Sequence, residues 1–199
     1  VVSFGRSGIS SETVGMLELL RKHAPDADKL NITCNAESAL GVDVATEGGE
    51  LRGIILPPET NDRGFAMTSS YSSMLLTALA CFDPHPPAAP SALLRQDADA
   101  LDSFLVDGFA RLAAIPRPRR AIFLGSGPLT GSARECALKV LELAAGQIVT
   151  AWDSTLGFRH GPKAIVDQDT LVFVLESSDP YTAQYAPDHP PEIVRQIGP

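Results

Sequence analysis

Two acidic side chains and one basic side chain recur at helical spacing in the segment Glu135-Cys-Ala-Leu-Lys139-Val-Leu-Glu142. At 3.6 residues per turn, positions i, i+4 and i+7 lie on one face of an α-helix. The other positions are mostly apolar, so a line of ionisable groups runs along a helix that otherwise packs. His160, followed by a glycine, comes eighteen residues after Glu142. Carboxylates, an ammonium group and an imidazole are the groups that transfer protons in general acid–base catalysis.

The same residues also have a purely structural explanation. A glutamate and a lysine at i and i+4 often form a solvated salt bridge, which stabilises a helix by only about 0.2–0.5 kcal/mol. A histidine that follows a strand is often a structural residue. For the helix taken alone this explanation is the commoner one, so the rest of the chain has to decide between the two.

The composition is that of a globular protein that handles small molecules. The chain has 199 residues, of which 44% are hydrophobic and 20% charged, which is enough apolar material for a core. The net charge of −8 disfavours a nucleic-acid surface, which needs clustered Lys and Arg. No apolar run approaches the roughly 18 residues of a membrane span. We therefore expect a small-molecule ligand, with no nucleic-acid or membrane partner.

The cysteines and glycine-rich loops indicate neither a metal nor a redox cofactor. Cys34, Cys81 and Cys136 are dispersed, without metal-ligand spacing, which favours the reducing cytoplasm. The loop Gly125-Ser-Gly127 has Thr130 where a dinucleotide-binding motif needs its third glycine. We therefore predict a cytoplasmic protein, and neither pattern favours a metal or a dinucleotide.

Short apolar segments alternate with amphipathic segments along the chain. Strands are predicted at residues 1–4, 30–34, 53–56, 121–124, 148–152 and 171–175, and helices at 12–23, 70–82, 93–115 and around Glu135, with Ser11 and Ser132 as N-caps. Strands separated by helices predict right-handed βαβ units around parallel sheets.

A proline-rich segment divides this pattern into two. Four prolines lie within residues 84–90, and proline interrupts both helix and sheet. We therefore predict two α/β lobes at residues 1–83 and 93–199, joined by a linker at 84–92. The first lobe is expected to lack its N-terminal part, because the sequence starts on a strand.

Two hydroxyl-rich loops follow predicted strands. Ser7, Ser10 and Ser11 come after the first strand, and the segment Thr68–Ser73 opens a helix with five serine and threonine hydroxyl groups. Open α/β sheets bind ligands beyond the carboxyl ends of their strands. Hydroxyls and backbone N–H groups at a helix start can bind phosphate. Helix capping would explain the first loop equally well.

Taken together, these motifs resemble the tandem form of the sugar isomerase (SIS) domain. The loop Ser7–Glu12 is similar to the sugar-phosphate loop of that family. The helix Glu135–Glu142 and the segment His160–Pro162 resemble the catalytic helix and histidine loop of the isomerase half of glucosamine-6-phosphate synthase. The sequence differs from the synthase at Gly5 and near Met67, where the synthase has ligand serines, and a counterpart of the synthase's lysine-bearing C-terminal tail is not expected.

The closer resemblance is to the tagatose-6-phosphate ketose/aldose isomerase family, also described as galactosamine-6-phosphate deaminase/isomerase. It covers nearly the whole chain, and it is carried by the segments Pro57–Thr60, Phe65–Ser70, Leu156–Lys163 and Ser177–Tyr181. It implies three-layer αβα SIS lobes. It also implies an enzyme that converts a hexosamine 6-phosphate to a ketose 6-phosphate and ammonia, without a metal or other cofactor.

The resemblance further implies a role for each site residue. His160 would open the sugar ring, Glu142 would carry the proton between C1 and C2, and Lys139, held by Glu135, would stabilise the developing negative charge. The predicted substrate-binding residues are Arg6, Ser7, Ser10, Ser11, Thr68, Ser69, Ser70 and Ser126. In SIS enzymes the histidine often reaches the pocket of a partner subunit, so a homodimer or higher homo-oligomer is expected.

Other functions stay open at this point. The chain could be a sugar-phosphate-binding regulatory SIS protein without catalysis, an isomerase without deaminase activity, or a scaffold with degenerate sites. The intact Glu142 and His160 argue against a regulator, because a sensor does not need a base at C1 and C2. The sequence leaves the stereochemistry at C4 of the sugar, galacto or gluco, undecided.

Overall fold

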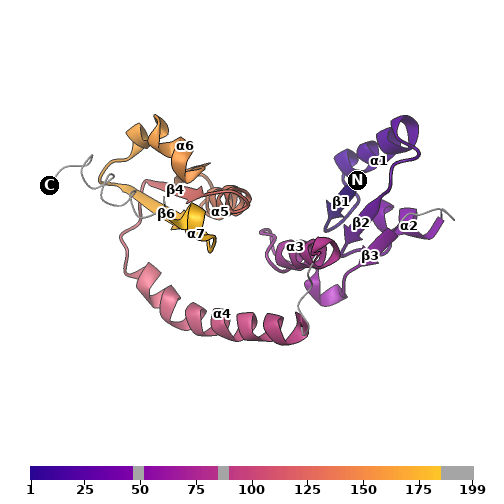
Figure 1. Cartoon of the computed structure of the whole chain (residues 1–199), viewed down its shortest axis with the longest axis horizontal. Helices are drawn as coiled ribbons and strands as arrows, with labels where there is room; N and C mark the ends of the chain where they lie inside the picture. The colour runs from indigo at the N-terminus through magenta and orange to yellow at the C-terminus, as the bar shows by residue number, and fades with distance from the viewer. Residues whose placement is uncertain (47–51, 85–89, 185–199) are drawn as a thin grey trace. The chain divides into compact units, whose positions relative to one another are not determined.

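A computed structural model describes residues 1–46, 52–84 and 90–184 of the chain. The chain divides into two compact units, Val1–Asp97 and Ala98–Pro199. Each unit contains one three-stranded parallel sheet with helices beside it (Figure 1). The predicted α/β architecture of parallel sheets and flanking helices is therefore confirmed. No helix among the described residues is both long and apolar enough to cross a membrane.

The sheet of the first unit has the strand order β1-β2-β3. Its elements are β1 (Val2–Gly5), α1 (Ser11–His23), β2 (Leu30–Thr33), α2 (Ala39–Thr46), β3 (Arg52–Ile55), the 3-10 helix η1 (Pro58–Thr60) and α3 (Ser69–Phe82). Because all three strands run in parallel, the loops after β1, β2 and β3 leave the sheet at one edge. Two of these loops are the hydroxyl-rich loops of the sequence.

Alternate residues of β2 pack on opposite faces of this sheet, as strand geometry requires. Ile32 is buried in a cluster with Met74 of α3. On the other face, the buried Asn31 donates a hydrogen bond of 3.3 Å to the Leu40 carbonyl of α2. The two helices thus cover opposite faces of the sheet.

The sheet of the second unit has the order β5-β4-β6. Its elements are β4 (Arg120–Gly125), α5 (Leu129–Leu143), β5 (Val149–Asp153), α6 (Thr155–Arg159), the 3-10 helix η2 (Pro162–Ile165), β6 (Thr170–Leu175) and α7 (Pro180–Ala183). Before it, α4 (Pro90–Ala113) runs across the division between the units in sequence. The predicted helix at 93–115 matches α4, and residues 85–89 of the predicted linker lie outside the described residues.

The central strand β4 is buried along almost its whole length, and its alternate side chains contact different helices. Phe123 packs in one cluster with Ala133 and Ala137 of α5. Ile122, which points the opposite way, packs with Phe158 of α6. Hence α5 and α6 lie on opposite faces of the same sheet.

Two local predictions were wrong, and one helix was not predicted. Ser10, not Ser11, caps α1, because its Oγ accepts the Thr13 N–H at 3.2 Å. Ser132 lies inside α5 and does not cap it, because helical turns already begin at Ser126 and continue into the helix. The short helix α2 was not predicted, since it contains Gly, Val and Thr residues of low helix propensity.

Gly8, in the loop after β1, should be sensitive to substitution. Its φ is +61°, and an added Cβ would lie 2.4 Å from Oγ of the buried Ser38. The left-handed conformation alone disfavours alanine by roughly 1–2 kcal/mol. We expect Gly8→Ala to lower the free energy of unfolding by at least that amount in urea denaturation followed by circular dichroism.

Gly15 provides the matched control. It lies inside α1, and an added Cβ would meet nothing within 4 Å. Gly15→Ala should raise the stability by about 0.8–1 kcal/mol, the difference in helix propensity. Equal stability of the Gly8→Ala variant and the wild-type protein would contradict the loop conformation described here.

Candidate active site

The predicted line of ionisable side chains, Glu135, Lys139 and Glu142, is formed on α5; we call it the α5 line. The Lys139 ammonium lies 2.6 Å from a Glu142 carboxylate oxygen and 3.5 Å from a Glu135 carboxylate oxygen. All three side chains are partly covered, with exposed fractions between 21% and 29%. One cation therefore bridges two carboxylates on a single helix face, as the i, i+4, i+7 spacing predicts.

This line points away from the sheet of its own unit. Ala133 and Ala137 pack against β4, whereas Glu135 and Glu142 lie about half a turn around the helix from them. The apolar Leu138 and Leu141 are also more than 40% exposed, so the prediction that they are packing residues is wrong within this unit. A substrate at the line would thus lie on the outer face of α5.

Lys139 keeps its positive charge because of its neighbours. Its pKa is raised above the ordinary lysine value, chiefly by the hydrogen bond with Glu142, while partial burial opposes the shift. A fixed ammonium group can stabilise an oxyanion that forms in a transition state. The arrangement combines a carboxylate base with a permanent cation within one hydrogen bond of each other.

The serine loop, residues Gly5–Ser11, is held from the neighbouring β2 loop. Asn35 donates from Nδ2 to the Ser7 carbonyl at 3.1 Å. Ser10 caps α1, Ser11 begins it, and both side chains are exposed. The hydroxyls of this loop remain at the sheet edge where α/β proteins bind ligands, although Ser10 Oγ is also engaged as a cap.

The second hydroxyl-rich segment faces a carboxylate of the protein itself. The backbone N–H groups of Thr68, Ser69 and Ser70 donate to Asp62 at 2.9–3.0 Å. The Thr68 and Ser70 hydroxyls donate to the same carboxylate at 2.9 and 2.6 Å. These hydrogen bonds, that from the Ser70 hydroxyl first, hold the pKa of Asp62 well below its usual range. An internal anion thus occupies the start of α3 in this structure.

His160 is not brought to the α5 line within its own unit. It ends α6 as its C-cap and is exposed, and α6 lies on the opposite face of the sheet from α5. Ser126 is also turned to the α6 side, because its hydroxyl is hydrogen-bonded to that of the buried Thr155 at the start of α6.

Sequence reasoning missed Asp62 and Asn35. Asp62 precedes Thr68 by six residues, and an ordinary N-cap bonds an N–H only two or three residues ahead, so no capping pattern reveals it. Asn35 lies in the loop after β2. Its hydrogen bond to Ser7 joins residues 28 positions apart, which only the strand order brings together.

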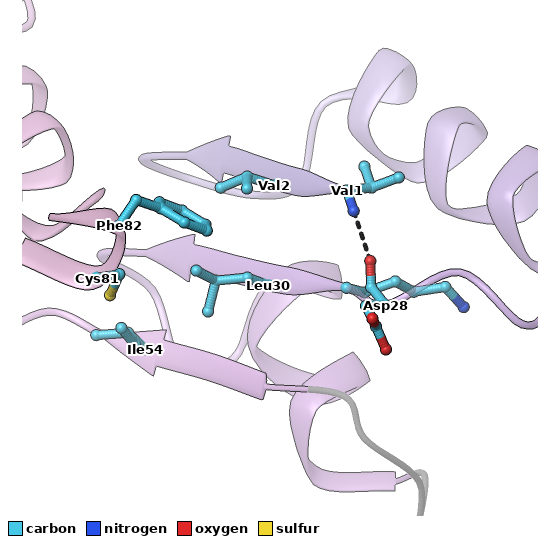
Figure 2. Close-up of a pocket in the computed structure, with 8 residues that line it drawn as sticks. Val1, Val2, Asp28, Leu30, Ile54, Cys81 and Phe82 are labelled. Carbon is cyan, nitrogen blue, oxygen red and sulfur yellow. Dashed lines mark hydrogen bonds between the residues drawn. The ribbon is translucent and has the colours of Figure 1, made fainter. Parts of the chain in front are cut away.

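A groove in the first unit contains none of the predicted site residues. Figure 2 shows it beside the sheet, lined mainly by apolar side chains that include Val2, Leu30, Ile54 and Phe82. Within the described residues, no group of three or more His, Cys, Asp or Glu side chains could hold a metal ion.

The sequence is similar over nearly its whole length to curated D-galactosamine-6-phosphate deaminases. It is 44% identical over 198 residues to AgaS of Escherichia coli O157:H7, which is 98% of this chain and 51% of the relative. It is 43% identical over 197 residues to AgaS of Shewanella sp. (strain ANA-3), which is 98% of this chain and 50% of the relative. The chain spans about half the length of these relatives. No protein-family model matches it.

The structure resembles the crystal structure of tagatose-6-phosphate ketose/aldose isomerase from Escherichia coli. The TM-score is 0.88 at 42% sequence identity, and the match covers 98% of this chain and 53% of that chain. The chain has the SIS fold. The resemblance of the sequence to the tagatose-6-phosphate ketose/aldose isomerase family is thereby confirmed.

The hydrogen bond from Lys139 in this SIS chain can be tested without an activity assay. The pKa of Lys139 is higher in the folded than in the unfolded state. Its interactions therefore stabilise the fold fully at a pH below the unfolded-state pKa, and this stabilisation is lost as the pH rises through the folded-state pKa. We expect Glu142→Gln to lower the Lys139 pKa more than Glu135→Gln does, in NMR titrations of labelled lysine. A larger effect of Glu135→Gln would contradict the observed geometry.

Proposed function

We propose that the protein containing this chain is a galactosamine-6-phosphate deaminase/isomerase that forms a ketose 6-phosphate and ammonia. The observation that carries the proposal is the identity of 43–44% with D-galactosamine-6-phosphate deaminases over 98% of the chain. The carboxylate–ammonium line on α5 supports it, because the reaction needs a base and a fixed cation at neighbouring carbon atoms. It has to be tested on the intact protein.

In the proposed reaction, His160 assists opening of the sugar ring to the free aldehyde. Glu142 then removes the C2 proton, and the electron pair shifts to give an enolamine whose C1 oxygen is stabilised by Lys139. Return of the proton to C1 leaves an imine at C2. Water adds to this imine and ammonia leaves, so that the products are a 2-ketose 6-phosphate and ammonia. Glu135 keeps Lys139 in place through their ion pair.

We further propose that the two units are two SIS-type lobes, and that the serine loop of the first holds the phosphate. Ser7, Ser10 and Ser11 follow β1, with the start of α1 supplying N–H groups that favour an anion. Arg6 in the same loop adds a positive charge. The proposal gives Thr68–Ser70 a secondary part, since Asp62 already accepts their hydrogen bonds.

We also propose that the protein acts in the cytoplasm as a homodimer or higher homo-oligomer, with His160 serving the α5 line of another copy. The support for this is topological. The sheet of the second unit separates α6 from α5, and His160 is exposed at the end of α6. A histidine supplied by a second chain would meet the α5 line without crossing that sheet.

Glu142→Gln tests the function most simply. The amide keeps the shape of the side chain but cannot accept the C2 proton, and loss of a general base typically lowers the rate by about 10²–10⁴-fold. We expect ammonia release from galactosamine 6-phosphate to fall by this factor while substrate affinity is retained. Glu18→Gln, on the exposed side of α1, is the control and should match the wild-type protein. Near-normal turnover of Glu142→Gln would remove Glu142 from the mechanism.

Mixing two inactive variants tests the exchange of His160 between chains. His160→Ala and Glu142→Gln proteins are combined under conditions in which subunits exchange, and ammonia release is measured. A heterodimer contains one site with both residues intact, so up to about a quarter of the wild-type rate should return for random pairing of two chains. Absence of rescue after subunit exchange has been verified by mass spectrometry would place His160 in the site of its own chain.

A further inference from the structure

Asp62 connects two loops at the ligand-binding edge of the first sheet. Its carboxylate accepts five hydrogen bonds from the start of α3, contributed by Thr68, Ser69 and Ser70. Its backbone carbonyl accepts a further hydrogen bond, at 3.1 Å, from Nη1 of Arg6 in the serine loop. The residue that fixes the start of α3 is therefore also the acceptor that orients the Arg6 guanidinium.

The carboxylate is held more firmly than helix capping requires. An ordinary N-cap side chain satisfies one or two N–H groups of the first turn. Asp62 accepts three N–H groups and two hydroxyls, and the Ser70 side chain that approaches it most closely is fully buried. Hydrogen bonds to an ionised acceptor are short and strong, and the helix dipole adds to them. The position of the Asp62 backbone is thus fixed from within the fold.

Arg6 needs such a fixed acceptor. Its side chain has several rotatable bonds and is only partly buried, so it loses much rotational freedom when its guanidinium is held in one place. The serine loop around it is already tied down on the β2 side by the hydrogen bond between Asn35 and Ser7. The Asp62 carbonyl ties it down on the β3 side.

We propose that Asp62 is a positioning residue for substrate binding, which holds Arg6 in the orientation that receives the phosphate of the sugar. This inference rests on the proposed function, because it takes Arg6 and the serine loop as the phosphate site. Asp62 itself does not touch the substrate. Its carboxylate holds the loop after β3 to the start of α3, and its backbone carbonyl, fixed in this way, accepts the hydrogen bond from Arg6.

A double-mutant cycle on the intact protein tests this. Asp62→Ala and Arg6→Ala are each expected to raise KM for galactosamine 6-phosphate about tenfold with little change in kcat, the loss typical of one hydrogen bond to a charged group. The double variant should be no worse than the more impaired single variant, because Asp62 is proposed to act on substrate binding only through Arg6. All variants are assayed well below the melting temperature of the least stable one.

Asp167 is the control for a purely structural effect. Its carboxylate also accepts several hydrogen bonds, from Arg120, Thr170 and the Asp169 N–H. It lies in the second unit, at the amino ends of β4 and β6, away from the carboxyl ends where ligands are expected. Asp167→Ala should lower the melting temperature and leave KM unchanged. If Asp62→Ala does not fold, Asp62→Asn replaces it, with a smaller rise in KM expected in the same direction.

The outcomes separate this inference from the proposed function. If the wild-type protein neither binds nor converts galactosamine 6-phosphate, the proposed function fails and this inference fails with it. If the wild-type protein is active but Asp62→Ala changes only the melting temperature, Asp62 is a structural cap and the inference alone is wrong. KM effects of Asp62→Ala and Arg6→Ala that multiply in the double variant would also overturn it, because the two residues would then act independently.

Discussion

The buried strand β4 is the constraint on which the arrangement of the ionisable groups depends. Successive side chains of a strand point to opposite faces, so Phe123 anchors α5 on one face and Ile122 anchors α6 on the other. The hydrogen-bonded sheet between them is continuous. Consequently, the line of Glu135, Lys139 and Glu142 lies on one face of this sheet, and His160, proposed to open the sugar ring, ends the helix on the other face. The case for a site that uses more than one chain follows from this separation.

In the first unit, polar contacts join the loops that follow the strands. Asn35 donates a hydrogen bond to the Ser7 carbonyl, and Arg6 donates one to the Asp62 carbonyl. The close approach of Gly8 to the buried Ser38 adds a steric constraint. These contacts join the loop after β1 to the loops after β2 and β3, which the parallel strand order places at the same end of the sheet. This rigidity supports the proposal that the serine loop binds the phosphate of the substrate.

The sequence predicted much of this, and its failures have physical reasons. Helical periodicity placed Glu135, Lys139 and Glu142 on one face, because that depends only on local geometry. Periodicity could not tell that this face turns away from the sheet, since that depends on which residues pack. The hydroxyls of Thr68 and Ser70 were assigned to phosphate because the bond to Asp62 is not a local pattern. Short helices such as α2 were missed because packing, not propensity, stabilises them.

The most direct test of the whole account is a crystal structure of the intact Glu142→Gln protein with galactosamine 6-phosphate bound. The account predicts that the phosphate lies within hydrogen-bond distance of the Ser7 and Ser10 hydroxyls, and that Asp62 stays bonded to the start of α3. It also predicts that the substituted side chain at position 142 faces C1 and C2, and that the nearest His160 comes from another copy of the chain. A phosphate bound at Thr68–Ser70 in place of Asp62, or a sugar bound away from α5, would contradict it.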